Sequence, residues 1–326
     1  MPFLRSRSLR SLVLGLSFLT GLAGGVAAQT FPDRPIRLIV HFGPGGGTDL
    51  MARVFAEAAG GVLGRGMVVE NRAGGGATVG IIALTQARPD GYTLAVCPPI
   101  CATVEALYDP PPFRGAALAP VVSIADLPLV LVVPRSLGVT DVAGLLRKAR
   151  ETQGGLSYAM PGAGSSNHLA AEVFRRASGQ EMTAIPYRSG AAALTDIVAG
   201  RVAFYFDTLA SALPQVRSGE VVALAVTGAA RAPQLPEVPT MGEAGVPGLE
   251  YSARLRVVAP ASTPPAVIET LNAAFQRALA EPALRQRIID VGGVPAGGTV
   301  AEATGDLRDE PERLGRVIRE GGIKAD

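Results

Sequence analysis

The groups best suited to bind a ligand in this sequence are the backbone amides of a glycine-rich turn at residues 42–49, Phe-Gly-Pro-Gly-Gly-Gly-Thr-Asp. An apolar run that begins at Ile36 leads into this turn, and a helical pattern follows it. Glycines let N–H groups crowd a ligand, and a helix start adds partial positive charge, so the turn suits an oxyanion. The candidate ligand contacts are Phe42, Gly45, Gly46, Gly47, Thr48 and Asp49. The alternative is a tight turn in which Thr48 or Asp49 caps the helix.

This turn does not match a nucleotide-binding fingerprint. Gly-x-Gly-x-x-Gly beginning at Gly43 needs glycine at position 48, where Thr48 stands, and no Gly-Lys-Ser/Thr follows. We therefore expect no nucleotide and no other cofactor.

A second turn at residues 161–168, Pro-Gly-Ala-Gly-Ser-Ser-Asn-His, again follows a strand pattern and opens a helix. It offers hydroxyls as well as amides, and its candidate contacts are Gly164, Ser165, Ser166, Asn167 and His168. The alternative is that Ser and Asn cap the helix and that His168 is structural or exposed. A third glycine turn at residues 72–76 contains one polar side chain, that of Arg72, and we interpret this turn as structural.

Ser165, His168 and Asp207 are the residue types of a nucleophile, a base and an orienting acid. Their spacing argues against catalysis, because a nucleophile elbow reads Gly-x-Ser-x-Gly and Gly164 directly precedes Ser165. The chain has two His and no His/Cys/carboxylate cluster, so the sequence predicts neither an enzyme nor a metal site. Cys97 and Cys101 are either disulfide-bonded, in an oxidising compartment, or two buried thiols.

Short β-branched runs alternate with longer Ala/Leu-rich segments of helical period, a pattern typical of parallel α/β structure. The predicted strands are residues 36–41, 67–70, 93–97, 129–133, 156–159, 202–206, 221–227 and 255–259. The predicted helices are residues 49–63, 78–87, 141–150, 167–177, 191–199, 209–218, 264–280, 282–291 and one from about 302. Because proline disrupts a helix interior, we expect a break near Glu310, with Pro311 opening a new helix.

The first 28 residues are typical of a cleavable export signal. Arg5, Arg7 and Arg10 precede an apolar run, and small residues give a cleavage site near Ala28. No Cys follows directly after these small residues, so a lipid anchor is not predicted. Removing this leader leaves 30 − 3 = 27 basic against 28 acidic residues. A mature chain without basic excess lacks the electrostatic footprint of a nucleic-acid-binding protein.

Eight sequence blocks occur in the order and spacing of one protein family. They include Pro-Gly-Gly-Gly-Thr-Asp at 44–49, Val-Glu-Asn-Arg at 69–72, Pro-Asp-Gly-Tyr-Thr-Leu at 89–94, Gly-Ala-Gly-Ser-Ser-Asn-His-Leu-Ala at 162–170 and Pro-Tyr-Arg-Ser-Gly at 186–190. The others lie at residues 32–40, 224–227 and 235–240. Over residues 30–324 the chain resembles the Bug family, the periplasmic solute-binding receptors of tripartite tricarboxylate transporters.

The resemblance implies a two-lobed α/β binding protein of type II, a Venus flytrap with mainly parallel sheets flanked by helices. It places lobe 1 at residues 29–131 and 226–326 and lobe 2 at 132–225. A ligand carboxylate is then held by amides and water from residues 42–49 and 164–168, while Asp207 faces the cleft and reads ligand specificity. The implied partners are a small organic carboxylate and, by transient docking, membrane permease subunits. The implied protein is a periplasmic monomer that is not embedded in the membrane.

The sequence departs from the family where Arg254 and Arg256 replace an aromatic residue and a glycine. Both Arg fall on one face of a predicted strand, and we hypothesise that they add positive potential for a second ligand carboxylate. The alternative is a solvated strand face or salt bridges between the lobes. Residues 98–100 lack the usual hydroxyls, which puts a third set of ligand contacts in doubt. His41 stands beside the first loop in place of proline, either as a pH-sensitive group or as a buried neutral side chain.

Three function classes remain open at this point. The leading one is a transport receptor that captures a carboxylate and presents it to a permease. The second is a ligand sensor for a membrane signalling partner, and the third, more remote, is a hydrolase that uses Ser165. The ligand itself is left open among monocarboxylates, aromatic acids, amino acids and di- or tricarboxylates.

Overall fold

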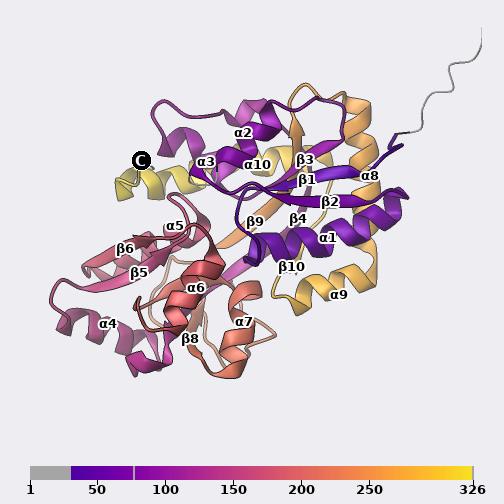
Figure 1. Ribbon diagram of the computed structural model, residues 1–326. Coiled ribbons are helices and arrows are strands. Elements are labelled where there is room, and N and C mark those ends of the chain that lie inside the picture. Colours follow the sequence, from indigo (N-terminus) through magenta and orange to yellow (C-terminus); the bar gives the residue numbers. More distant parts are fainter. Residues whose placement is uncertain (1–30, 76–77, 325–326) are drawn as a thin grey trace, which may run out of the picture. The chain divides into compact units, whose positions relative to one another are not determined.

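A computed structural model describes residues 31–75 and 78–324 (Figure 1). Residues 34–326 form one compact unit. The predicted export signal at residues 1–28 lies outside the described residues. Within the described part of the chain, no helix is long and apolar enough to cross a lipid bilayer.

A first group of elements comes from the two ends of this unit. β1 (Ile36–Val40) pairs in parallel with β2 (Met67–Asn71) and β3 (Thr93–Cys97), and β9 (Ser252–Pro260) pairs antiparallel with β3. β1 and β3 are apolar and almost wholly buried, as expected of strands covered on both faces. The helices of this group are α1 (Gly47–Leu63), α2 (Thr78–Thr85), α3 (Ile100–Leu107), α8 (Pro265–Ala280), α9 (Pro282–Asp290) and α10 (Val300–Gly321).

A second group comes from the middle of the chain. β5 (Leu156–Met160) and β6 (Met182–Pro186) pair in parallel as a small sheet. β7 (Tyr205–Thr208) and β8 (Val221–Val226) pair antiparallel with a strand of the main sheet. The helices of this second group are α4 (Val142–Glu151), α5 (Ser166–Ser178), α6 (Gly190–Val198) and α7 (Leu209–Ser218).

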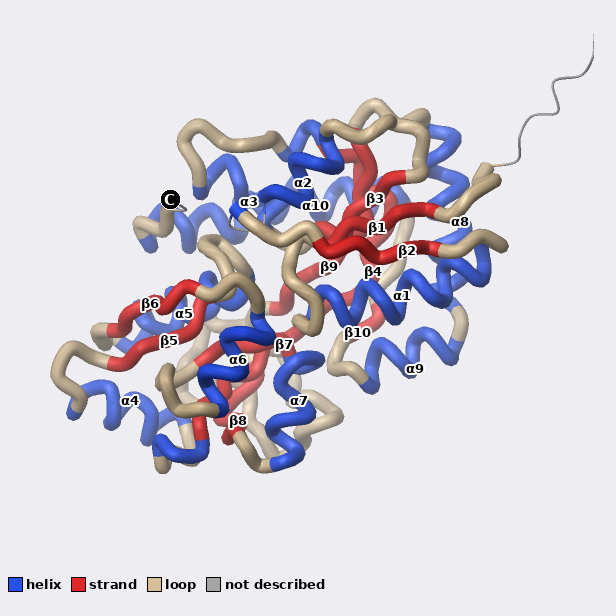
Figure 2. Tube along the Cα trace, viewed as in Figure 1, coloured by secondary structure: helices blue, strands red, loops and turns tan. Residues whose placement is uncertain are grey.

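One long strand, β4 (Leu118–Pro134), serves both groups. Its first part pairs with β9 from Leu118 to Pro128, and its last part pairs with β7 and β8 from Leu129 onward. A two-residue strand, β10 (Val294–Pro295), also joins it. The strand tube in Figure 2 shows β4 running from one group into the other. The backbone hydrogen bonds of a single strand therefore connect the two groups.

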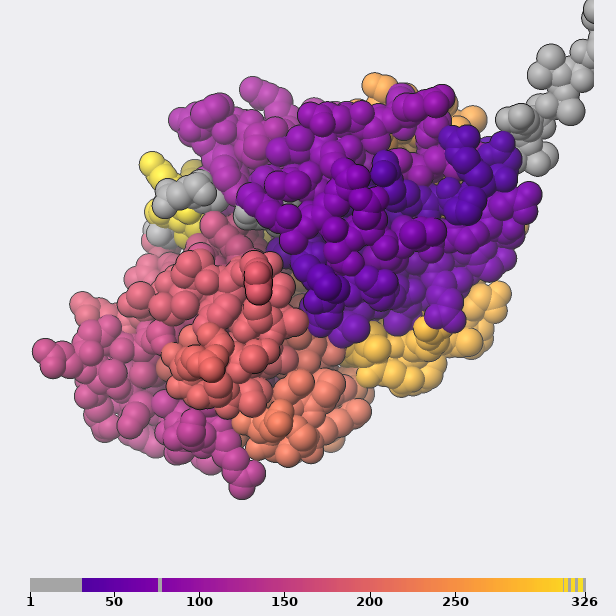
Figure 3. Space-filling model, in the orientation of Figure 1, coloured from indigo at the N-terminus to yellow at the C-terminus, as the bar shows by residue number. Residues whose placement is uncertain are grey.

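The buried side chains of β4 alternate between two core clusters of the second group. Leu129, Leu131 and Val133 contribute to one cluster with Phe174, while Val130 and Val132 contribute to the other. This alternation is the period of two of a strand with both faces covered. A third cluster fills the first group between β3, α2, α3 and α10, and Leu169 of α5 joins it. On the face shown in Figure 3, the indigo surface of the first group touches the salmon surface of the second.

The α/β class is confirmed, but the sheets are mixed rather than mainly parallel. Among the described residues, three strand pairings are parallel and five are antiparallel, because β4 and β9 run against their neighbours. All eight predicted strands and nine predicted helices have counterparts, with β4 much longer than expected and β7 beginning later. β6, β10 and α3 were not predicted from the sequence. Cys97 and Cys101 are disulfide-bonded, with Cα atoms 6.0 Å apart, which decides between the two alternatives.

The predicted helix break near Glu310 is wrong, because α10 runs without interruption through Pro311. Buried side chains anchor α10 on both sides of the proline. Leu307 precedes it, Leu314 and Ile318 follow it, and all three belong to the core cluster of the first group. Tertiary packing on both sides therefore outweighs the cost of an interior proline.

Candidate functional site

Two small adjoining cavities lie where the loop before α1 meets the start of α5 and the end of β7. We call the first the polar cavity because Tyr205 and Asp207 line it and not the other, and the second the apolar cavity because Pro98, Ile100 and Leu127 line it and not the first. Phe42, Thr48, Asn167 and Thr208 line both. The polar cavity is also lined by Gly46, Gly47, Pro161, Gly190, Tyr205 and Asp207. The apolar cavity is also lined by Pro98, Ile100, Leu127, Ser165, Ser166 and Ala253. Their volumes are about 30 and 20 Å³, room for a few water molecules.

The α1 start brings unused amides to the polar cavity. Gly46 is the N-cap residue and Gly47 the first helical residue, and in the described structure no side chain caps this helix. Gly45 has φ 84°, a left-handed conformation that favours glycine. The N–H groups of the first helical turn lack partners within a helix, so here they are available to an acceptor in the cavity.

Asp49 holds this loop in place and does not line either cavity. Its carboxylate accepts hydrogen bonds from Gly45 N at 2.9 Å, Arg53 Nε at 3.0 Å and Asn71 Nδ2 at 2.8 Å. Burial alone would raise the pKa of Asp49, but these donors outweigh burial and lower it. Asn71 Nδ2 also donates to the Phe42 carbonyl oxygen at 3.0 Å. An ionised Asp49 thus fixes the loop from behind while the amides face forward.

The second predicted loop uses part of its hydrogen-bonding capacity internally. Ser165 Oγ accepts from His168 N at 3.3 Å and so caps α5, and His168 Nδ1 accepts from Gly164 N at 3.0 Å. Two amides that the sequence offers to a ligand are therefore already bonded. Ser165, Ser166 and Asn167 do line the cavities, whereas Gly164 and His168 do not.

This geometry does not pair Ser165 with His168 as nucleophile and base. Ser165 Oγ meets the backbone N–H of His168, and the imidazole Nδ1 is occupied by the Gly164 amide. Burial lowers the pKa of His168, so the ring is neutral at physiological pH. Among the described residues, no three His, Cys, Asp or Glu side chains gather so as to hold a metal ion.

The end of β7 forms the floor of the polar cavity. Asn167 Nδ2 donates to Tyr205 Oη at 3.1 Å and to the Phe206 carbonyl oxygen at 2.7 Å, which ties α5 to β7. Asp207 is 2% exposed, and its Oδ1 accepts from Thr208 N at 2.8 Å. Within residues 31–75 and 78–324, Asp207 Oδ2 and Thr208 Oγ1 are buried and have no hydrogen-bond partner.

Burial is also what sets the ionisation of Asp207. It raises the pKa of this carboxyl to about 7, although the Ser211 hydroxyl, the amide and hydroxyl of Thr208 and the Tyr205 hydroxyl lower it. Thr208 is the N-cap residue of α7, and in the described structure its side chain does not cap that helix. Two helix N-termini without side-chain caps, those of α1 and α7, therefore meet at the polar cavity.

The α1 loop and the β7–α7 junction are in close contact. A Cβ added at Gly47 would lie 2.7 Å from Thr208 Cβ, and one added at Gly43 would lie 3.1 Å from Ser189 Cβ. Real Cβ atoms do not approach other atoms as closely as 2.7 Å, so position 47 requires glycine in this arrangement. Gly45 faces Ala191 at a third point of contact and lines a separate cavity there.

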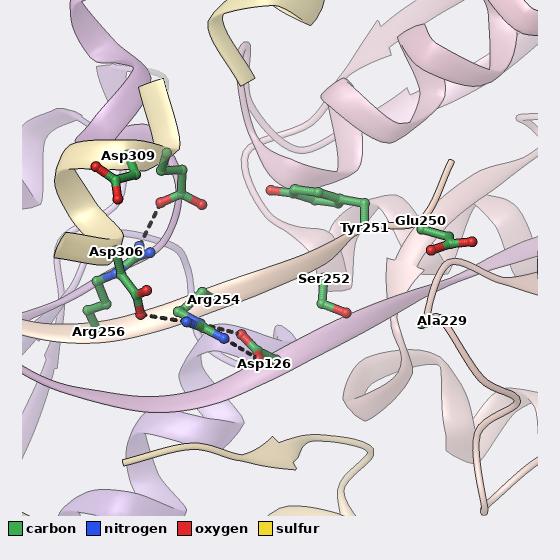
Figure 4. A pocket seen from close by; sticks show the side chains of 10 residues that line it. Asp126, Ala229, Glu250, Tyr251, Ser252, Arg254, Arg256, Asp306 and Asp309 are labelled. Atoms are coloured by element: carbon green, nitrogen blue, oxygen red, sulfur yellow. Dashed lines mark hydrogen bonds and ion pairs between the residues drawn. The ribbon is translucent and has the colours of Figure 1, made fainter. Parts of the chain in front are cut away.

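Arg254 does not line these cavities but a third, charged cavity of about 430 Å³ (Figure 4). Its Nε and Nη2 donate to the carboxylate of Asp126, each at 2.8 Å, and Nη1 donates to Asp306. These bonds raise the pKa of Arg254. The positive charge of Arg254 is therefore neutralised by Asp126 on β4 and Asp306 on α10.

Arg256 is more deeply buried than Arg254. Its Nη1 lies 2.7 Å from Glu310 Oε2, and both side chains are 1% exposed. This pair links β9 to α10 just before Pro311. The structure thus shows ion pairs for both Arg254 and Arg256, but their partners lie on β4 and α10, within residues 29–131 and 226–326, so these pairs are not the salt bridges between lobes that the sequence raised as an alternative.

His41 is fully buried behind the first loop. Burial lowers its pKa to about 4, so the ring is neutral across the physiological range. Residues that line the cavities but were not predicted include Tyr205, Thr208, Gly190 and Pro161. A sequence signal existed for Thr208, which follows a strand pattern and directly precedes a helical one. Tyr205 carries no such signal, since its place depends on the packing of β7 against α5.

Comparisons with known proteins agree with this fold. The model of the tripartite tricarboxylate transporter family receptor matches residues 51–323. The chain is 35% identical to protein BugT of Bordetella pertussis over 96% of this chain and 97% of that protein.

Two solved structures with bound acids are similar to this chain. One is Rpa4515 of R. palustris with adipate, with a TM-score of 0.87 and 34% identity over 90% of this chain and 99% of that one. The other is MatC of Rhodopseudomonas palustris with bound malate, with a TM-score of 0.82 and 29% identity over 88% of this chain and 100% of that one. The eight sequence blocks, the fold and the family match agree. The chain belongs to the receptor family of the tripartite tricarboxylate transporters.

Proposed function

We propose that this protein captures a small carboxylate between the start of α1 and the β7–α7 junction and delivers it to a tripartite tricarboxylate-type membrane permease. The observation that carries this proposal is the meeting of two uncapped helix N-termini, α1 and α7, at one cavity. N–H groups and aligned helix dipoles stabilise an anion without a countercharge. Among the described residues that line the polar and apolar cavities there is no Lys or Arg, so neutral donors carry the recognition.

The bound acids of two family members support a carboxylate as the ligand class. Rpa4515 has been solved with adipate and MatC with malate, two dicarboxylates of different length. In this chain the contacts would come from the amides of Gly46, Gly47 and Thr48 on one side. On the other side they would come from Ser165, Ser166, Asn167 and the Asp207–Thr208 junction. Pro98, Ile100, Leu127 and Ala253 supply apolar surface for the carbon chain of the acid.

Ligand entry requires the two sides of the site to separate. Cavities of about 30 and 20 Å³ are too small for an acid of four to six carbons. We assign residues 29–131 and 226–326 to one lobe and 132–225 to the other, with β4 and β8 as the crossings. These lobes close around the acid, and the permease then recognises the closed conformation.

The remaining expectations concern location and chemistry. The chain is exported to the periplasm, its leader is removed near Ala28, and it acts there as a monomer. It binds its ligand without transforming it, which the description of the family as a receptor supports. Delivery to a permease, rather than to a sensor, is supported by the family description, which names a transporter.

The proposal is tested with the mature chain beginning at Gln29. Thermal shift and calorimetry against acetate, adipate, malate, benzoate and glutamate should give one-to-one binding of at least one acid and no product after long incubation. An acid present at 100 times its dissociation constant adds about 2.7 kcal/mol of stability, which is readily measured. Binding of a neutral or cationic solute in preference to every acid of this panel would refute the proposal.

A further inference from the structure

Asp207 is the acidic side chain that lines the polar cavity among the described residues, and its place there is unusual for a site that receives an anion. It is 2% exposed, and one of its two carboxyl oxygens, Oδ2, makes no hydrogen bond in the described structure. Leaving an ionised oxygen buried without a donor is costly, because neither water nor a cation replaces its lost solvation.

Among the described residues that line the polar cavity there is no Lys or Arg to offset a negative charge on Asp207. Its partner in the sheet is Val130 of β4, and its other neighbours are Gly190 at the start of α6, Thr208 at the end of β7 and Ser211 of α7. Tyr205 on its own strand interacts with Asp207, and the first turns of the helices that line the cavity contain His168 on α5 and Asp49 on α1. Burial raises the pKa of Tyr205 and lowers that of His168, so both are neutral, whereas Asp49 is held as an anion by Arg53.

A second unpartnered group lies next to Asp207. Thr208 Oγ1 is also buried without a hydrogen-bond partner in residues 31–75 and 78–324, and its side chain contacts Gly47. A ligand that separates Gly47 from Thr208 therefore meets a free hydroxyl and a free carboxyl oxygen side by side. An ionised Asp207 would repel an incoming carboxylate, whereas a protonated one would donate a hydrogen bond to it.

We propose that Asp207 is a neutral carboxylic acid in the ligand-bound protein and that its Oδ2–H donates a hydrogen bond to a carboxylate oxygen of the ligand. The carboxylate is then captured together with one proton above neutral pH. The proton comes from solvent, remains on Asp207 while the acid is bound, and returns when the acid leaves. This inference rests on the proposed function. It makes Asp207 a specificity residue that selects an acceptor and disfavours a ligand ammonium group at this point.

Calorimetric titration of the mature protein with adipate, or with another acid of the panel that binds, tests the inference. Titrations at pH 6.0, 7.0, 8.0 and 8.5, in phosphate and in Tris, give the number of protons taken up from the difference in buffer ionisation heat. Because Asp207 is already protonated below its pKa of about 7, we expect little uptake at pH 6.0 and an uptake approaching one proton at pH 8.5. Affinity should be level below pH 7 and then fall up to about tenfold per pH unit.

Asp207→Asn is the matched variant, since its amide N–H donates at every pH. Its affinity should stay within about tenfold of the wild-type value at pH 6, with no proton uptake and no pH dependence. Asp196→Asn is the control. Asp196 lies on α6, is ionised and bonded to Tyr187 and Arg201, and does not line the cavity. That variant should keep the wild-type proton uptake.

The outcomes separate this inference from the proposed function. Binding of an acid with no proton uptake at pH 8.5, or with affinity that rises with pH, overturns the role of Asp207 and leaves carboxylate capture intact. Failure of every acid in the panel to bind overturns both.

Discussion

Arg256 of β9 and Glu310 of α10 form an ion pair in the core of the protein, with Nη1 2.7 Å from Oε2 and both side chains 1% exposed. The pair fixes α10 to the sheet one residue before Pro311, inside a helix that continues to Gly321. A buried charge is tolerated only while its partner is present.

Glu310→Gln should therefore lower the free energy of unfolding by about 3 kcal/mol, because it leaves the Arg256 charge buried without a counterion. Urea unfolding monitored by circular dichroism measures this change. Asp309→Asn, at the adjacent and 68% exposed position, is the control and should leave the free energy of unfolding close to the wild-type value. The double variant Arg256→Met with Glu310→Met should recover part of the loss. A loss equal to that of Asp309→Asn would show that the pair is not buried in solution.

Gly47→Ala should weaken the binding of the panel acid at least tenfold, because its Cβ would project toward Thr208 into the space that the ligand must fill. Gly61→Ala is the matched control on the same helix, since a Cβ there meets nothing within 4 Å. The control should keep wild-type affinity and gain stability of up to about 1 kcal/mol from helix propensity. Equal affinities of the two variants would argue against a ligand in this space.

Arg254→Met should leave the affinity for the panel acid within about twofold of wild type, because its guanidinium lies in the charged cavity with Asp126 and Asp306. Thermal unfolding should detect the loss of these bonds as a lower Tm. Calorimetry of the same variant decides the earlier hypothesis of a second ligand carboxylate, since a tenfold or greater loss of affinity would place Arg254 in ligand recognition.

The stability of the ligand-free protein should depend on pH through Asp207. Its pKa is raised to about 7 in the folded protein from an ordinary value of 3.8, so the folded state binds the proton more tightly than the unfolded state. The stability from this group is fully present below pH 3.8 and is lost as pH rises through about 7. The Tm of Asp207→Asn minus that of wild type should therefore increase between pH 5 and pH 8. A constant difference across this range would contradict the raised pKa.

Much of the fold follows from local pattern. β1 and the α1 helix were predictable because a buried apolar run and a helical period stand on either side of a glycine-rich turn. β6 was missed because its five residues are only half buried or exposed and show no strand alternation. α3 was missed because Pro98 and Pro99 argue for an extended segment. The helix in fact begins directly after them, and the Cys97–Cys101 bond joins its first turn to the end of β3.

The sequence by itself determined the alternation of strands and helices, the two glycine-rich turns, the absence of basic excess and the family resemblance, because each depends on residues close together in the chain. Only the tertiary structure decided that Ser165 and His168 use their loop's amides internally, that Arg254 and Arg256 are ion-paired, and that Tyr205 and Thr208 line the cavity with Gly47. These outcomes depend on contacts between segments more than 30 residues apart, or on the competition between internal and ligand hydrogen bonds. Pro311 is a further example of tertiary contacts overriding local propensity. Propensity predicts a break there, but packing on both sides of the proline keeps the helix continuous.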